Sequence, residues 1–118
     1  MLNHQKVWGH YGEQLASQFL KKLGYQILAL NHYCHHEEID LIAQDGQTLV
    51  LVEVKLRCSQ SFGTATEALT INKLTHLKKA ASYLINKYQI SNWRYDFIAI
   101  DVNSIKSSAR LRHYRQIL

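Results

Sequence analysis

The chain has 118 residues, of which 47% are hydrophobic and 19% charged, a composition typical of one globular domain. No apolar run approaches the roughly 20 residues that cross a bilayer, and the first residues lack the apolar segment of a signal peptide. We therefore expect no membrane partner and a cytoplasmic location. The two cysteines, Cys34 and Cys58, lie far apart in the sequence, so free thiols are expected. The net charge of +5 favours a polyanionic partner.

A helix is expected first, over about residues 5–23, because apolar residues recur there at helical spacing and Gly24 provides a stop. Glu13 falls at the margin of the apolar face. Its neighbours include small residues that would let the helix approach a sheet closely, namely Gly9, Gly12 and Ala16. Two roles remain open for Glu13: a solvated carboxylate on the helix flank, or a ligand that reaches a metal held by strands.

A strand is expected over residues 25–30, followed by a polar loop over residues 31–37. The loop holds four potential zinc ligands, His32, Cys34, His35 and His36. Zinc sites need four converging ligands, usually from two paired motifs, and only Cys58 is available elsewhere, so zinc is not assigned. The imidazoles and Tyr33 are expected to face substrate or solvent, with His35 and His36 as candidates for phosphate contact.

Two strands joined by a tight turn are expected over residues 38–55, because the Asp45-Gly46 step tolerates the positive φ values that hairpin turns require. If Asp45 and Gly46 form a two-residue loop, Asp40 lies opposite Leu51 and Glu38 lies opposite Glu53. Side chains alternate along a strand, so Asp40, Glu53 and Lys55 share one face.

Charges in such apolar strands are costly to desolvate unless they are paired or bind a metal. An Asp and a Glu that converge suit Mg²⁺ or Mn²⁺, which prefer oxygen ligands and keep positions open for water and phosphate. Lys55, two residues after Glu53, would then orient the attacking water or neutralise negative charge in the transition state. The alternative is a solvent-facing ion pair between Glu53 and Lys55. The upstream Asp40, on the matching face, favours the metal site.

The second half predicts a loop from Arg57, a long amphipathic helix ending near Tyr88, and a core strand over residues 94–102. Arg57 and Lys73 are candidates for contacts with nucleic-acid phosphates, although a solvated basic helix face is the alternative for Lys73. The basic tail over residues 110–115 fits either nucleic-acid backbone contact or a final edge strand. The expected order α-β-β-β-α-β gives an α/β domain with an antiparallel hairpin and a parallel crossover.

With these motifs in this order, the chain resembles the restriction-endonuclease-like (PD-(D/E)xK) superfamily. More narrowly, it resembles the YraN-like family of small bacterial predicted endonucleases, which is similar to the archaeal Holliday-junction resolvases. The matching motifs span nearly the whole chain: Gly12-Glu13, Gly24-Tyr25, Glu38-Ile39-Asp40, Val52-Glu53-Val54-Lys55, Phe62-Gly63 and Arg94-Tyr95-Asp96. One departure is Glu37, where the family usually has glycine. A carboxylate there would crowd or augment the site.

The resemblance implies a single restriction-endonuclease-like domain over residues 1–118, with a mixed β-sheet flanked by helices. It implies a structure-selective DNA endonuclease of the repair and recombination type that uses Mg²⁺ or Mn²⁺ on branched or structured DNA. Asp40 and Glu53 would bind the metal, Glu13 would complete the site, and Lys55 would serve the nucleophile. Resolvases work as dimers, so a homodimer is implied as well. The alternative is a nucleic-acid-binding or scaffold protein that retains the fold without cleaving, and the choice between DNA and RNA stays open.

Overall fold

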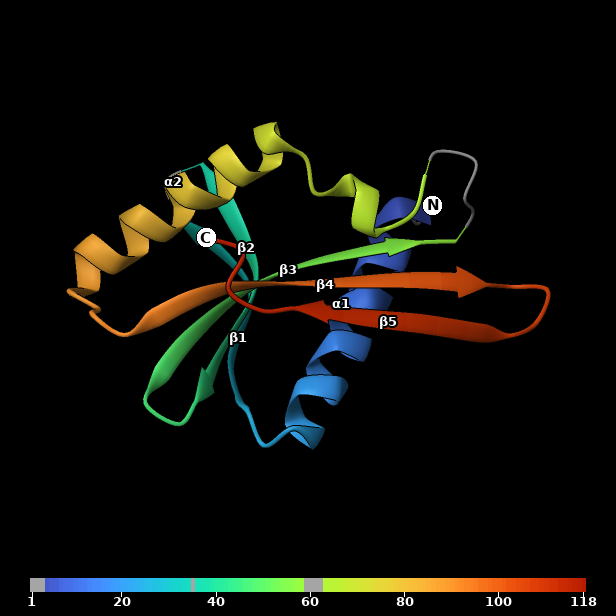
Figure 1. Cartoon of the computed structure of the whole chain (residues 1–118), viewed down its shortest axis with the longest axis horizontal. Coiled ribbons are helices and arrows are strands. Elements are labelled where there is room, and N and C mark those ends of the chain that lie inside the picture. Colours follow the sequence, from blue (N-terminus) through green and yellow to red (C-terminus); the bar gives the residue numbers. More distant parts are fainter. Residues whose placement is uncertain (1–3, 35, 59–62) are drawn as a thin grey trace.

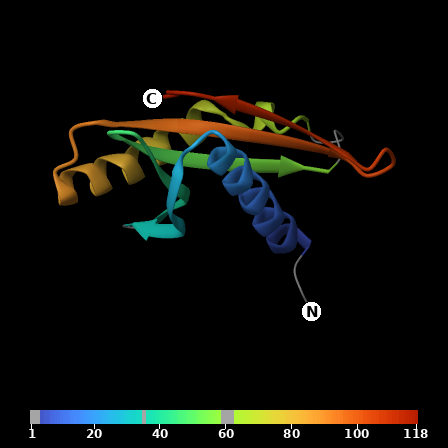
Figure 2. The same ribbon diagram turned by 90° about the horizontal axis from the view of Figure 1, so that it is seen from below.

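Two helices pack on opposite faces of a mixed five-stranded sheet in the computed structural model, which describes residues 4–34, 36–58 and 63–118 (Figures 1 and 2). The sheet order is β1-β2-β3-β4-β5, and only β3 and β4 pair in parallel. The elements are α1 (His4–Lys22), β1 (Gln26–Cys34), β2 (Glu37–Asp45), β3 (Thr48–Arg57), the 3-10 turn η2 (Thr66–Ala68), α2 (Ile71–Tyr88), β4 (Trp93–Asn103) and β5 (Ser108–Tyr114). The expected α/β class is confirmed, with α2 forming the crossover between the parallel strands.

The two sheet faces form separate cores because side chains alternate along each strand. On one face, Ala16 and Leu20 of α1 pack against Val50 and Val52 of β3. On the other face, Leu77, Ala81 and Leu84 of α2 pack against Leu51 and Tyr95. Glu53 and Lys55 have the parity of Leu51, so they lie on the face that α2 covers.

The boundaries of α1 follow from local chemistry. Gly24 has φ of +93°, a conformation that glycine adopts without strain. The amides of Gly24 and Tyr25 donate to the carbonyls of Lys21 and Leu20, the paired hydrogen bonds of a Schellman ending. The expected stop at Gly24 is therefore confirmed.

The prediction of a polar loop over residues 31–37 is wrong, because β1 extends as far as Cys34. Pairing with β2 carries the strand on, with His32 opposite Ile39 and Tyr33 opposite Glu38. Cys34 is buried and its Sγ donates to the carbonyl of Ala80, 3.3 Å away. A tertiary contact to α2 thus extends a segment whose composition suggested a loop. The basic tail forms β5, an edge strand of the sheet, so the expected final edge strand is confirmed, while its contact with nucleic acid stays a prediction.

The turn between β2 and β3 differs from the expected one by one residue. Asp45 pairs with Thr48, so Gly46, at φ +59°, and Gln47 form the two-residue loop. The pairing then places Ile42 opposite Leu51, where Asp40 was expected. Because the shift along β3 is two residues, Asp40 stays on the expected face.

Neither helix of the described segments has the length and hydropathy needed to span a bilayer.

The two glycines of α1 allow a matched test of how closely this helix approaches the sheet. A Cβ at Gly12 would lie 3.1 Å from Cβ of Leu56, whereas a Cβ at Gly9 would meet no atom within 4 Å. Gly12→Leu should lower the free energy of unfolding by about 1–3 kcal/mol through overpacking. Gly9→Leu should raise it by up to about 1 kcal/mol, because leucine favours helix over glycine. Urea unfolding of both variants measures the difference, and equal effects would contradict the close approach at Gly12.

Candidate metal centre

Asp40 lies where β2 separates from β3. The regular pairing ends at Leu41 and Val52. If the same register continued by one residue, Asp40 would lie opposite Glu53. Beyond this point Oδ2 of Asp40 accepts a hydrogen bond from the backbone amide of Val54, at 2.8 Å. The Asp40 carboxylate therefore takes the place of the β2 carbonyl that would otherwise accept from the amide of Val54. This bond to the backbone of β3 fixes the position of the carboxylate.

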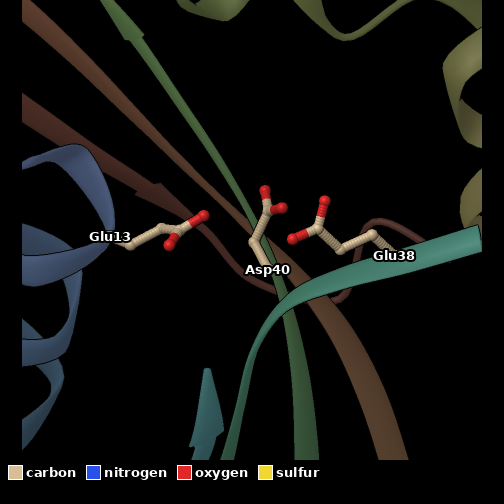
Figure 3. Close-up of side chains that lie close together, drawn as sticks. All are labelled: Glu13, Glu38 and Asp40. Atoms are coloured by element: carbon tan, nitrogen blue, oxygen red, sulfur yellow. The ribbon is translucent and has the colours of Figure 1, made fainter. Parts of the chain in front are cut away.

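Asp40 belongs to a group of three carboxylates with Glu13 and Glu38. One oxygen from each lies within 4.8 Å of the others, and Figure 3 shows the three side chains pointing toward one another from α1 and β2. Burial and the nearby Asp40 raise the pKa of Glu13, while a hydrogen bond with the Asn31 side chain opposes this rise. Burial and Asp40 likewise raise the pKa of Glu38. Three carboxylates held this close repel one another unless a proton or a cation neutralises them.

Glu53 lies beside Asp40 and is 7% exposed. Burial and the charge of Asp40 raise its pKa to about 8. One oxygen, Oε1, lies 3.3 Å from Nζ of Lys73 in α2. The other, Oε2, is buried and has no hydrogen-bond partner among the described residues. A buried carboxylate oxygen without a partner is costly, and a bound cation would satisfy it.

Three basic side chains lie near Glu53. Lys55, Arg57 and Lys73 line one pocket of about 330 Å³ with Glu53 and Thr70, which caps the start of α2. The positive charges of Lys73 and Lys55 oppose the rise that burial causes in the pKa of Asp40. Nε of Arg57 is buried without a hydrogen-bond partner in the described part of the chain. This pocket can receive an anion directly beside the carboxylates.

The structure brings most of the predicted site residues into this one region. Asp40 and Glu13 share the carboxylate group, Glu53 adjoins Asp40, and Lys55 lines the adjacent pocket. His36 lies in the turn between β1 and β2 with φ of +70°. His35, also a candidate for phosphate contact, lies outside the described residues.

Two glutamates of β2 differ from expectation. Glu38 joins the carboxylate group, although the sequence analysis gave it no role as a ligand. The signal was present, because Glu38 and Asp40 are two residues apart on one strand and so project to one side. Glu37 contacts α2 instead, with Oε1 3.0 Å from Nδ1 of His76. It therefore neither crowds nor augments the group of three.

The donor set fits a hard divalent cation. Glu13, Glu38 and Asp40 offer carboxylate oxygens from two elements, and Mg²⁺ and Mn²⁺ prefer such ligands. This group, the one metal-binding candidate found among the described residues, contains no histidine or cysteine. Zinc has no support there, because its sites are built mainly from those two residue types.

The raised pKa of Glu53 predicts a pH dependence of stability in metal-free buffer containing EDTA. Glu53 titrates near 4.5 when unfolded and near 8 when folded, so the folded state binds this proton more tightly. The stabilisation is fully present below about pH 4.5 and is lost as pH rises toward 8. Glu53→Gln should flatten the decline in the free energy of unfolding between pH 6 and 8. Glu67→Gln, at an exposed glutamate, should keep it, and parallel wild-type and Glu53→Gln curves would disprove the assignment.

Comparison with known proteins places the chain in one family over most of its length. The model of the uncharacterised protein family UPF0102 matches residues 12–100. A UPF0102 protein of Caldicellulosiruptor saccharolyticus is 45% identical over 84% of both chains. UPF0102 proteins of Herpetosiphon aurantiacus and Carboxydothermus hydrogenoformans are 37% and 39% identical, each over at least 98% of both chains. The chain therefore belongs to the UPF0102 family, the YraN-like family that its motifs predicted.

Proposed function

We propose that this protein is a Mg²⁺- or Mn²⁺-dependent endonuclease that hydrolyses phosphodiester bonds in branched or structured DNA. The observation that carries the proposal is the position of Asp40, which lies in one group with Glu13 and Glu38 and also beside Glu53, whose buried Oε2 has no partner among the described residues. The resemblance to restriction-endonuclease-like proteins supports the same assignment for Asp40, Glu53 and Lys55. The net charge of +5 is consistent with a polyanionic substrate.

Each residue has a role that its position supports. Asp40, Glu53 and the two carboxylates beside Asp40 would hold the metal, which polarises a phosphoryl oxygen and lowers the pKa of bound water. Lys55 lies beside the carboxylates and would orient the water or stabilise negative charge on the phosphate. Arg57 and Lys73 line the same pocket and would bind the phosphates of the substrate strand.

One contact favours a second candidate function. Lys73 already pairs with Glu53, which partly neutralises an acid that metal binding requires. A protein that keeps this pair would bind nucleic acid as a scaffold without cleaving it. The two functions differ in their response to EDTA, because cleavage requires the metal. A scaffold would bind equally well in EDTA, and more tightly when the carboxylates are neutralised, since carboxylates repel phosphate.

Metal binding should be visible as a gain in stability. Mg²⁺ or Mn²⁺ at 100 times its Kd should stabilise the folded protein by about 2.7 kcal/mol and raise the Tm. Asp40→Asn should abolish the Tm shift, because Asp40 lies close both to the Glu13–Glu38 pair and to Glu53. Glu37→Gln changes another acid of β2, outside the group of three, and should keep it. An equal shift in Asp40→Asn would place the metal elsewhere.

The catalytic role of Lys55 is tested by cleavage of branched, flap, single-stranded and linear DNA. Lys55→Ala should lose about 10²–10³-fold in rate, the usual effect of removing an electrostatic partner of the transition state, while the metal-induced Tm shift remains. Lys78→Ala, on α2 and outside this pocket, should cleave at the wild-type rate. Equal cleavage by Lys55→Ala would remove the role of this lysine. No metal-dependent cleavage of any substrate by the wild type would leave the scaffold function in its place.

A further inference from the structure

A groove opens beside the carboxylate group on the α1 side, and it shares no lining residue with the pocket of Lys55, Arg57 and Lys73. It has a volume of about 380 Å³. One wall is α1, and the other is the end of β1 with the start of β2. The lining residues are Gly9, His10, Glu13, Asn31, Tyr33 and Glu38. Two of the three clustered carboxylates, Glu13 and Glu38, thus belong to this groove as well.

An exposed aromatic ring forms part of the groove. Tyr33 is 76% exposed, although it lies within a regular strand and directly opposite Glu38. Residues directly opposite each other in an antiparallel pair have Cβ atoms about 4.5–5.5 Å apart. The ring therefore stands next to a carboxylate of the candidate metal centre, where its faces are accessible to a flat ligand.

The rest of the groove is shaped around the same centre. Asn31 has φ of +52°, a left-handed conformation that asparagine tolerates better than most residues. Its side chain hydrogen-bonds Glu13 and so fixes one of the carboxylates. On α1, Gly9 leaves the helix surface bare, since a Cβ there would meet no atom within 4 Å. His10 adds a second, 68% exposed ring on the helix wall.

We propose that this groove binds one unpaired nucleobase, stacked on Tyr33, next to the phosphate at the carboxylate group. The inference rests on the proposed function in that a nucleic acid is the partner. A neutral base suits the groove better than a second phosphate, because Glu13 and Glu38 face it. A base inside a duplex would first have to unstack, whereas a flap, gap or loop presents a base that is already free. The protein should therefore prefer DNA with an unpaired nucleotide beside the bond to be cut.

The test measures binding without cleavage, in Ca²⁺ instead of Mg²⁺. The probe is a DNA duplex with a one-nucleotide flap of 2-aminopurine, and the reference is the same duplex without the flap. Tyr33→Ala should weaken binding of the flap DNA about 10- to 100-fold, the usual effect of losing one base–aromatic stack, and should abolish quenching of 2-aminopurine fluorescence. Tyr33→Phe should keep both. Tyr88→Ala, at an exposed tyrosine at the end of α2, should behave as wild type.

Two further measurements separate stacking from a general loss of structure. A flap that lacks its base should bind the wild type as weakly as the complete flap binds Tyr33→Ala, and combining the two changes should add nothing. Gly9→Leu should fill the groove and lose the preference for flap over duplex, while its Tm equals or exceeds that of the wild type.

The proposal is overturned if wild-type protein binds flap and fully paired DNA equally, or if Tyr33→Ala keeps the flap preference and the quenching. Cleavage in Mg²⁺ is scored separately on the same DNA. Binding that depends on Tyr33 without any cleavage would support the base site and refute the endonuclease. Cleavage that ignores both the flap and Tyr33 would refute the base site and support the endonuclease.

Discussion

The hydrogen bond from the amide of Val54 to the carboxylate of Asp40 is the contact on which the candidate site depends. In a continuous ladder this amide would be paired with a main-chain carbonyl of β2. Because the Asp40 side chain accepts this hydrogen bond instead, β2 turns away from β3 while the part-buried amide keeps a partner. At this divergence Glu13 from α1 approaches Asp40 (Figure 3). Asp40 also lies beside Glu53. The same hydrogen bond therefore sets both the path of β2 and the position of the Asp40 carboxylate in the candidate site.

Charge is arranged in order around Asp40. Glu13, Glu38 and Asp40 form one acidic group, whereas Lys55, Arg57 and Lys73 line the neighbouring pocket together with Glu53. Glu53 has one oxygen paired to Lys73 and the other without a partner among the described residues. This separation suits the hydrolysis of a phosphodiester, because cations can contact the phosphate oxygens of the strand while a metal at the carboxylates polarises an oxygen of the reacting phosphate. It also explains why a neutral base, and not a further phosphate, fits the groove beside Tyr33.

The opposite end of the same strands is held closed by a buried ionic network. Asp96 is fully buried and accepts hydrogen bonds from Nε of Arg94 at 3.0 Å, Nε2 of His113 at 2.8 Å and the amide of Gln116 at 3.0 Å. Burial alone would raise the pKa of Asp96, but these bonds outweigh it and hold that pKa below its ordinary value. Arg94 also binds Asp45 at the β2–β3 turn. These contacts thus link the β2–β3 turn to β4 and β5 at the end of β3 that lies away from the candidate site.

The sequence by itself determined the α/β class, because hydrophobic periodicity is a local property of each segment. It also determined that Asp40, Glu53 and Lys55 share one face, because a register shift of two residues leaves every side chain on the same face of its strand. The small residues around Glu13 left two roles open for it, and only the family resemblance favoured the ligand. Tertiary structure decided the rest. The extension of β1 through Cys34 depends on contacts with β2 and α2, and the approach of Glu13 to Glu38 depends on how α1 packs beside β2. The pairing of Lys73 with Glu53 joins residues from separate elements, and no local pattern specifies the distance between two elements.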